Sequence, residues 1–320
     1  MSRIHWLSGL TCAALLASGP ALAAERRWEV METPHFSVHY YPETKESAQS
    51  VATAAEEVLP KLLKDFGIEL QNRVPIILSR EVMFNGNAEP IKDRITLDPL
   101  LAKSSVIGTK RFIAHELTHV ITFQALASNV LFSKLTKLSS LSNLPTWFLE
   151  GLAQYEAEAW SPNNDRMLRL GTLEGKLLTE GQRNHFAMLG LYGGAAGYNE
   201  GYSLTKYLFD TYGHDKLNQL FTALRTDATL TFPMALEKVT GKKLGVIQQE
   251  WQKSIKQRYE TLAKNTPALP EGAISLVPSK DGTANVAPRL SPDGKQLAYL
   301  TSDGQESFLY LRGHIMGLLS

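Results

Sequence analysis

His115-Glu116-Leu117-Thr118-His119 is the stretch of this 320-residue sequence on which the interpretation of the fold depends. Histidines four residues apart lie on the same face of a helix, about one turn apart, so both imidazoles can reach one metal ion. Glu116 then lies beside the open side of that ion. This H-E-x-x-H pattern is typical of two zinc ligands and a carboxylate that takes a proton from metal-bound water.

The residues around this pentapeptide predict a buried helix, because apolar side chains lie on nearly all of its sides. They are Phe112, Ile113, Leu117, Val120, Ile121 and Phe123. Ile107-Gly108-Thr109 predicts a loop before the helix, with Thr109 as the N-cap. A five-residue match also arises by chance, so the pattern needs a third ligand.

A second segment, Pro145 to Tyr155, supplies a candidate for that ligand. Pro145 suits the first turn of a helix. Glu150 has apolar neighbours on this helix, namely Trp147, Phe148, Leu149, Leu152 and Ala153. A carboxylate in such surroundings is costly to bury unless it is paired or bound to a metal. Gly151 and Ala153 would let this helix approach the first one closely.

The two motifs together resemble those of the gluzincin metallopeptidases, specifically the bacterial peptidase MA-like domains. They read His115-Glu116-x-x-His119 and Trp147-Phe148-x-Glu150-Gly151-x-Ala153. The resemblance implies that His115, His119 and Glu150 bind Zn²⁺ and that Glu116 is the general base. An inactive relative that keeps these residues is the alternative. The segment Ser128–Asn143, between the motifs, resembles an insertion.

One position departs from this resemblance. Thermolysin-like relatives carry a carboxylate four residues after the ligand glutamate, where it orients a zinc histidine, whereas this chain has Gln154. An amide can accept a hydrogen bond from imidazole, but it adds no negative charge. We therefore expect weaker support of the histidine and unchanged ligands.

The resemblance also implies a donor that stabilises the oxyanion of amide hydrolysis. The segment from Tyr198 to Gly213 resembles the tyrosine-bearing helix of the family, and Tyr198 and Tyr202 are the candidates. Tyr198 is the first choice because it is expected to precede the helix. A structural tyrosine is the alternative for either residue, and His185 or His214 could play the same part.

Residues 1–24 are typical of a secretory signal peptide. Arg3 is followed by a short apolar run, Leu7–Leu16, and by the cleavage-site pattern Ala21-Leu22-Ala23. An N-terminal core helix is the alternative. The run is too short for a comfortable membrane span, and it contains Cys12, the only cysteine. The mature chain would have no cysteine and no transmembrane segment, which predicts a periplasmic or secreted protein.

The composition is that of a globular protein without a charge excess: 43% of residues are hydrophobic, 20% are charged, and the net charge is +1. Nothing here suggests nucleic-acid binding. The resemblance covers residues 26–263 and implies an α+β, thermolysin-like fold, with a small N-terminal sheet, an active helix pair and a helical second lobe.

Local patterns place the elements of this fold. Alternation predicts strands near 28–30 and at 36–40, short apolar strands follow at 74–78 and 94–98, and Asn85–Pro90 predicts a turn. Helices are expected at 43–66, ending at Gly67, and at 215–225, 232–240 and 244–263; residues 161–185 predict a covering loop or short helices. The resemblance implies that the 81–98 region offers an edge strand to the substrate backbone. An ordinary surface hairpin is the alternative.

A change to β patterning follows a predicted linker at 264–274. Ser291-Pro292-Asp293-Gly294 predicts a turn, with strands at 297–300 and 308–311, and this segment resembles a WD40-like propeller repeat of the TolB type. Residues 275–320 would form an incomplete repeat, since one blade cannot close a ring. We expect few contacts with the preceding domain and a surface for envelope protein partners.

The leading functional prediction is a zinc-dependent peptidase that acts on peptide or protein substrates in the bacterial envelope. Glu116 would take a proton from metal-bound water and return it to the leaving amine. No free-amine-binding motif is visible, which favours an endopeptidase over an aminopeptidase. Two alternatives remain: a non-catalytic periplasmic binding or assembly protein built on a former protease domain, and a zinc store.

Overall fold

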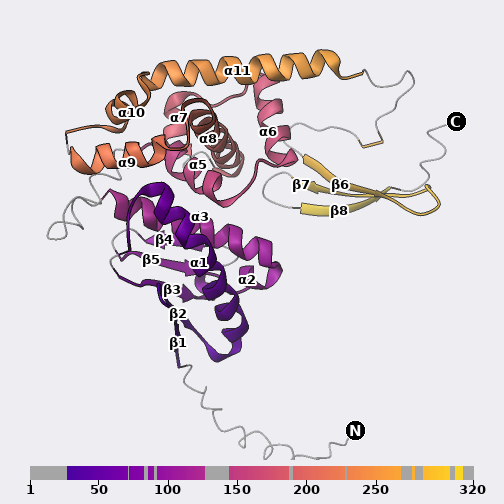
Figure 1. Ribbon diagram of the computed structural model, residues 1–320. Helices are drawn as coiled ribbons and strands as arrows, with labels where there is room; N and C mark the ends of the chain where they lie inside the picture. Colours follow the sequence, from indigo (N-terminus) through magenta and orange to yellow (C-terminus); the bar gives the residue numbers. More distant parts are fainter. Residues whose placement is uncertain are drawn as a thin grey trace, which may run out of the picture.

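The computed structural model describes residues 27–70, 72–82, 86–89, 92–126, 144–186, 190–227, 229–267, 276–277, 284–302 and 307–312. The predicted signal peptide and the predicted insertion at 128–143 lie outside these residues. Within them, the chain forms an N-terminal lobe, a helical lobe and a small separate sheet (Figure 1).

The N-terminal lobe is built on a five-stranded sheet with the order β1-β2-β3-β5-β4. The strands are β1 (Glu29–Glu32), β2 (Phe36–Tyr40), β3 (Val74–Leu78), β4 (Gly86–Glu89) and β5 (Arg94–Leu97). The three central strands run parallel, and both edge strands are antiparallel to their neighbours. In β2 and β3 alternate side chains are buried, as the period-two pattern predicts.

Strand β4 corrects the sequence-based expectation of a turn at 85–90. Its four residues pair with β5 in the register Gly86↔Leu97 to Glu89↔Arg94. Glycine, asparagine and glutamate have low intrinsic strand propensity, so this strand exists because of its partner. It forms an edge of the sheet next to helix α3, and the edge strand predicted in the 81–98 region is therefore present.

The longest helix of this lobe, α1 (Lys45–Phe66), follows a 3₁₀ turn at Pro42–Thr44. It ends as expected at Gly67, whose φ of 64° is the left-handed conformation that glycine adopts most easily. A second 3₁₀ turn lies at Arg80–Val82 and a short helix, α2, at Leu101–Ser104.

Helix α3 (Val106–Ala125) carries the H-E-x-x-H residues. It begins earlier than predicted, because Ser105 caps it: its hydroxyl accepts a hydrogen bond from the Gly108 N–H at 2.9 Å. The predicted cap, Thr109, lies inside the helix, where its hydroxyl donates to the Ser105 carbonyl at 2.9 Å. The predicted loop at 107–109 is the first turn of this helix.

The helical lobe contains seven helices among the described residues. They are α5 (Thr146–Ala157), α6 (Pro162–Leu173), α7 (Glu180–Asn184), α8 (Gly190–Tyr212), α9 (Lys216–Thr226), α10 (Phe232–Thr240) and α11 (Leu244–Asn265). The helices predicted at 215–225, 232–240 and 244–263 are confirmed to within two residues. The segment 161–185 holds α6 and α7, which agrees with the prediction of short helices there.

Helices α5 and α8 cross at two glycines. A Cβ on Gly151 would lie 2.3 Å from the Gly201 carbonyl oxygen, and a Cβ on Gly201 would lie 2.5 Å from the Trp147 carbonyl oxygen. Gly151 therefore lets α5 approach α8, and the prediction that it faces the H-E-x-x-H helix is wrong. Aromatic rings pack on the buried side of α5, where Phe148 contacts Phe221 and Phe232.

The small sheet consists of β6 (Ala284–Leu290), β7 (Leu297–Ser302) and β8 (Ser307–Arg312), paired antiparallel in that order. Among the described elements, these strands share no extensive contact with either lobe, as expected (Figure 1). Leu290, Leu309 and Leu311 are 60–73% exposed, so nothing among the described residues covers these side chains. Its assignment to a propeller stays a prediction.

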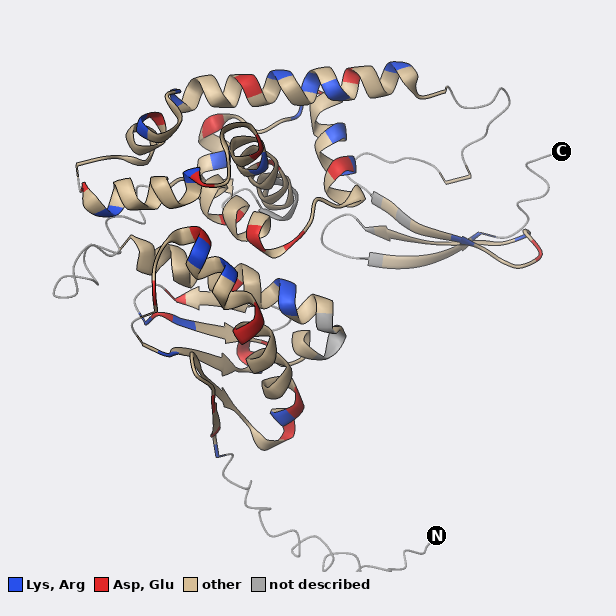
Figure 2. Cartoon of the chain, in the orientation of Figure 1, with Lys and Arg blue, Asp and Glu red and all other residues tan. Residues whose placement is uncertain are grey.

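Acidic and basic residues are interspersed along the helices and strands of both lobes (Figure 2). This agrees with the low net charge of the sequence. In the part of the chain that the structure describes, no helix combines the length and hydrophobicity that crossing a membrane requires.

Candidate metal and catalytic site

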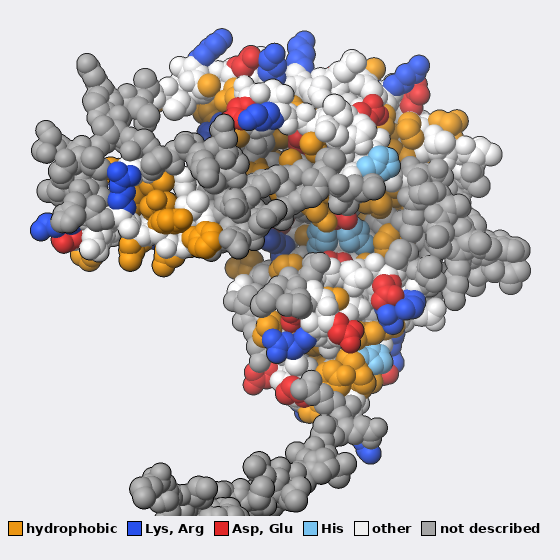
Figure 3. Space-filling model, turned by 180° about the vertical axis from the view of Figure 1, so that it is seen from behind, with side chains coloured by type: hydrophobic (Ala, Val, Ile, Leu, Met, Phe, Trp, Pro, Cys, Tyr) orange, Lys and Arg blue, Asp and Glu red, His pale blue; other side chains and the backbone are white. Residues whose placement is uncertain are grey.

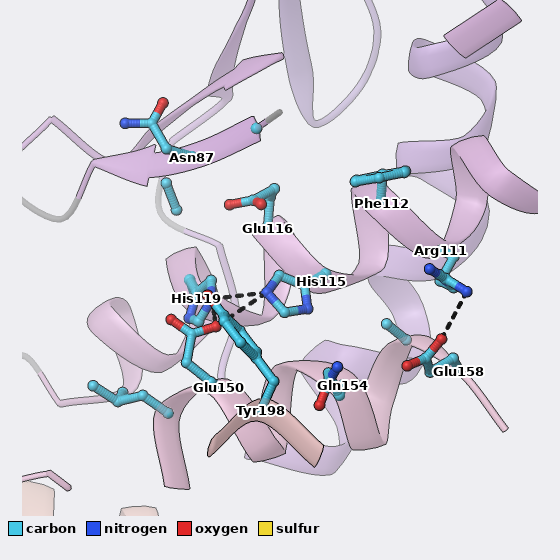
Figure 4. A pocket seen from close by; sticks show the side chains of 14 residues that line it. Asn87, Arg111, Phe112, His115, Glu116, His119, Glu150, Gln154, Glu158 and Tyr198 are labelled. Atoms are coloured by element: carbon cyan, nitrogen blue, oxygen red, sulfur yellow. Dashed lines mark hydrogen bonds and ion pairs between the residues drawn. The ribbon is translucent and has the colours of Figure 1, made fainter. Parts of the chain in front are cut away.

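Three ligand atoms from two helices converge at one point between the lobes (Figure 4). His115 and His119 come from α3 and Glu150 from α5. The two histidine Nε2 atoms are 3.3 Å apart, and the Glu150 Oε2 lies 3.3 Å from His115 Nε2 and 3.4 Å from His119 Nε2. The structure therefore brings together the three predicted ligands.

These spacings fit a tetrahedral cation. Zinc binds nitrogen and oxygen ligands at about 2.0–2.1 Å, which in a tetrahedron separates neighbouring ligand atoms by about 3.3–3.4 Å. The Glu150 Oε2 is also buried and makes no regular hydrogen bond. A buried carboxylate oxygen that faces two imidazole nitrogens in this way needs a positive charge. Two histidines and one carboxylate form the donor set of many zinc sites.

Electrostatics at the triad keep Glu150 ionised. Burial alone would raise the pKa of Glu150, but the two imidazoles outweigh burial and lower this pKa far below its usual range. Burial would lower the pKa of His119, and the facing Glu150 carboxylate outweighs that effect and raises it. The ionised Glu150 carboxylate therefore attracts positive charge to the imidazoles, and either a proton or a metal ion can supply that charge.

Glu116 lines the same cavity, which has a volume of about 480 Å³. The residue is 6% exposed. Burial raises the pKa of its carboxyl group, although the two neighbouring histidines oppose the shift and the Ala88 backbone N–H forms a hydrogen bond to it. A raised pKa makes this carboxylate a stronger proton acceptor, as a general base requires.

Strand β4 fixes the position of this carboxylate. A Cβ on Gly86 would lie 2.4 Å from the Leu97 side chain and 3.3 Å from both the Cγ and an oxygen of Glu116. The strand can approach α3 this closely only because glycine has no side chain. Gly86, Asn87 and Ala88 form one wall of the cavity, opposite α5 (Figure 4).

The two candidate tyrosines differ in position. Tyr198 lines the cavity beside Glu150, and both burial and that carboxylate raise its pKa well above the usual value. It lies inside α8, so the expectation that it precedes the helix is wrong. The Tyr202 hydroxyl donates to the Glu158 carbonyl, and its ring packs on Trp160. Tyr202 does not line the cavity and has a structural role.

The other sequence candidates lie elsewhere. His185 and His214 line two separate cavities. Gln154 lines the metal cavity, and its Oε1 is buried without a hydrogen-bond partner. Its amide nitrogen is drawn on the side of His115 and its oxygen on the opposite side (Figure 4).

Sequence reasoning missed an ion pair at one end of the cavity. Arg111 Nη1 lies 2.9 Å from Glu158 Oε2, and both residues line the cavity. Arg111 lies one turn before His115 on α3, so the helix period could have indicated it. In the space-filling view, histidine side chains lie in a recess between the two lobes, and this recess is open to solvent (Figure 3).

A family model described as the Peptidase MA superfamily matches residues 100–257. The match supports a peptidase MA-like domain. This domain includes α3, α5 and α8, and therefore all the residues that converge on the cavity except those of β4. The sheet of the N-terminal lobe and the strands β6–β8 lie outside the matched residues. No curated protein matches the chain.

Proposed function

We propose that the chain is a zinc-dependent peptidase of the gluzincin type, an endopeptidase of the bacterial envelope that acts on peptides or proteins. The observation that supports this most strongly is the triangle of His115, His119 and Glu150 atoms with 3.3–3.4 Å sides. Glu116 and an edge strand line the same cavity. The envelope location depends on the signal-peptide pattern at residues 1–24.

A zinc ion held by the triad supplies Lewis acidity, which lowers the pKa of water and polarises a carbonyl group. Glu116 takes a proton from the attacking water and returns it to the leaving amine. The Ala88 N–H holds the Glu116 carboxylate in place for both transfers. Tyr198, across the cavity on α8, is the donor for the oxyanion that develops on the substrate carbonyl.

Strand β4 orients an extended substrate. Its outer edge faces the cavity, since only its other edge pairs with β5. A peptide that adds to this edge would lie across the cleft, with its scissile carbonyl near the triad. The cavity is open to solvent, and an endopeptidase requires that a long chain passes through it.

Digestion of a peptide library by zinc-loaded protein tests the proposal. Glu116→Gln should retain the metal and lose activity by about 10²–10⁴-fold, because only proton transfer is removed. Glu237→Gln, on the exposed face of α10, is the matched control and should cleave like the wild type. A chelator should abolish cleavage, and zinc should restore it.

A non-catalytic envelope protein is the second candidate. The uncovered apolar residues of β8, including Leu309 and Leu311, favour it, because such surfaces commonly bind other proteins. It predicts that neither the chelator nor Glu116→Gln changes any measured property except metal content. Cleavage that survives in the Glu116→Gln variant at the wild-type rate would contradict the catalytic proposal.

A further inference from the structure

A second group of metal-ligating side chains lies outside the catalytic cavity. Asp65 is near the end of α1, Glu156 is near the end of α5, and His214 follows α8. His214 Nε2 lies 3.3 Å from Asp65 Oδ2 and 4.0 Å from Glu156 Oε1. One ligand atom from each residue lies within 4.8 Å of the other two.

The environment of the Glu156 side chain is the strongest evidence that this cluster binds an ion. It is 0% exposed, and its Oε2 accepts a hydrogen bond from the Lys61 ammonium group. Its Oε1 is buried, has no hydrogen-bond partner and faces His214. A buried carboxylate oxygen without a partner is costly. A cation between this oxygen and the imidazole would remove that cost.

The cluster has a net negative charge that a cation would balance. Two carboxylates, Asp65 and Glu156, share the single ammonium group of Lys61, which is 2.8 Å from Asp65 Oδ2. At Glu156, Lys61 uses Oε2 and leaves Oε1 to the cation, whereas at Asp65 the ammonium group and the cation would share Oδ2. The Tyr155 hydroxyl lies 3.4 Å from His214 Nδ1, and this contact holds the ring with Nε2 toward the carboxylates.

An ion can reach the cluster from solvent. The His214 side chain is 39% exposed and lines an open cavity of about 850 Å³, together with Asp65 and Tyr155. Because His214 lies in the short turn between α8 and α9, its ring can shift the fraction of an ångström that a bond of about 2.0–2.2 Å requires.

We propose that Asp65, Glu156 and His214 form a second site for a divalent transition-metal ion such as zinc, distinct from the catalytic triad. Imidazole with two carboxylates suits zinc and its neighbours in the first transition row. Asp65 belongs to the N-terminal lobe, whereas Glu156 and His214 belong to the helical lobe. The ion would therefore link the two lobes and stabilise the packing of α1 against the helical lobe.

Zinc stoichiometry tests the site independently of peptidase activity. Chelator-treated full-length protein is dialysed against buffered Zn²⁺, and bound metal is measured by mass spectrometry. We expect two zinc ions per wild-type chain and one in His214→Ala, whose zinc affinity at this site falls at least about 100-fold, more than the loss of an outer-shell partner. His185→Ala, at another cavity, is the matched control and should keep two.

A background without the triad separates the two sites. The double variant His115→Ala/His119→Ala should bind one zinc ion, and adding His214→Ala should remove it. Asp65→Asn in the same background provides a second test if His214→Ala folds poorly, and Lys61→Met should tighten zinc binding because it removes a repelling charge. If the double variant binds no zinc, or if His214→Ala leaves its zinc content unchanged, the second site does not exist. Cleavage by His214→Ala in excess zinc reports separately on the catalytic proposal.

Discussion

Replacing Gly151 by alanine tests whether the crossing of α5 and α8 positions the third ligand. The added Cβ would lie 2.3 Å from the Gly201 carbonyl oxygen and 2.7 Å from the Thr205 hydroxyl oxygen. An ordinary contact begins near 3.4 Å, and the nearest opposing atom is backbone. The two helices must therefore move apart by about 1 Å, because backbone cannot rotate away as a side chain can.

The stability cost follows from overpacking. Extra atoms in a packed interior cost about 1–3 kcal/mol. For a domain of this size, each kcal/mol changes the melting temperature by about 2–4 °C. We expect Gly151→Ala to melt up to about 8 °C below the wild type, because the helix propensity of alanine offsets part of this cost. Alanine is a better helix former than glycine by about 1 kcal/mol, so the clash must exceed that gain.

The same movement should weaken metal binding. Glu150 precedes Gly151 on α5, and its Oε2 forms two of the three 3.3–3.4 Å sides of the ligand triangle. Metal sites tolerate deviations of about 0.2 Å in ligand distance. A shift of about 1 Å would displace this oxygen, and we expect zinc affinity to fall about 10–100-fold, as when supporting contacts of a ligand are lost.

Gly245→Ala is the matched control. Gly245 also lies inside a helix, α11, but a Cβ there meets nothing within 4 Å. This variant should be slightly more stable than the wild type and should bind zinc equally well. Thermal melts with excess chelator report the packing cost alone, and zinc titrations report the ligand geometry. If Gly151→Ala melts at or above Gly245→Ala and keeps wild-type zinc affinity, the reasoning is refuted.

Three further predictions concern the base, the donor and a buried acid. Tyr198→Phe should lower kcat by about 10²–10³-fold without a change in stability. Tyr202→Phe should lower the free energy of unfolding by about 1 kcal/mol and leave kcat intact. The reverse pattern would exchange the roles of the two tyrosines. Gly86→Val should lower kcat but not zinc content, since the new side chain meets Glu116 and Leu97; retained kcat would show that β4 does not position the base. Burial raises the pKa of Glu200 to about 7, from 4.5. The folded state therefore holds this proton more tightly, and stability is full below pH 4.5 and falls as the pH rises through 7, by up to about 3 kcal/mol. Urea denaturation at several pH values should show this fall, and Glu200→Gln should flatten it.

The sequence predicted the convergence of His115, His119 and Glu150 because the signals for these residues are local. His115 and His119 are placed by the period of one helix, and Glu150 is notable for its apolar neighbours. The paired geometry of α3 and α5 then follows from burial of both helices. Gly67 ended α1 as expected, since only one conformation at that position satisfies the helix terminus.

Features that depend on a distant partner were missed. Gly86–Glu89 has turn-like composition and becomes a strand only through its ladder with β5. Gly151 faces Gly201 on α8, which no local pattern reveals. The helix period puts Tyr198 and Tyr202 on similar faces, but their positions along α8 send one into the cavity and the other to the Glu158 carbonyl.

The Asp65, Glu156 and His214 cluster illustrates the same limit. Its members come from three separate segments, each unremarkable by itself. From the sequence, Asp65 is expected to form an i,i+4 ion pair with Lys61. Glu156 is expected to be an ordinary charged residue near the end of a helix. Only the packing of α1 against the helical lobe brings the three residues within reach of one another.

The three strands β6–β8 also affect how the purified chain will behave. Several of their apolar side chains, including Leu309 and Leu311, are exposed, and each outer strand has a row of backbone groups that pair with no other described strand. Such edges pair with edges of other molecules. Samples should therefore self-associate as concentration rises. A light-scattering series that compares the full chain with a version ending at Asn265 would show whether β6–β8, and not the two lobes, cause the turbidity.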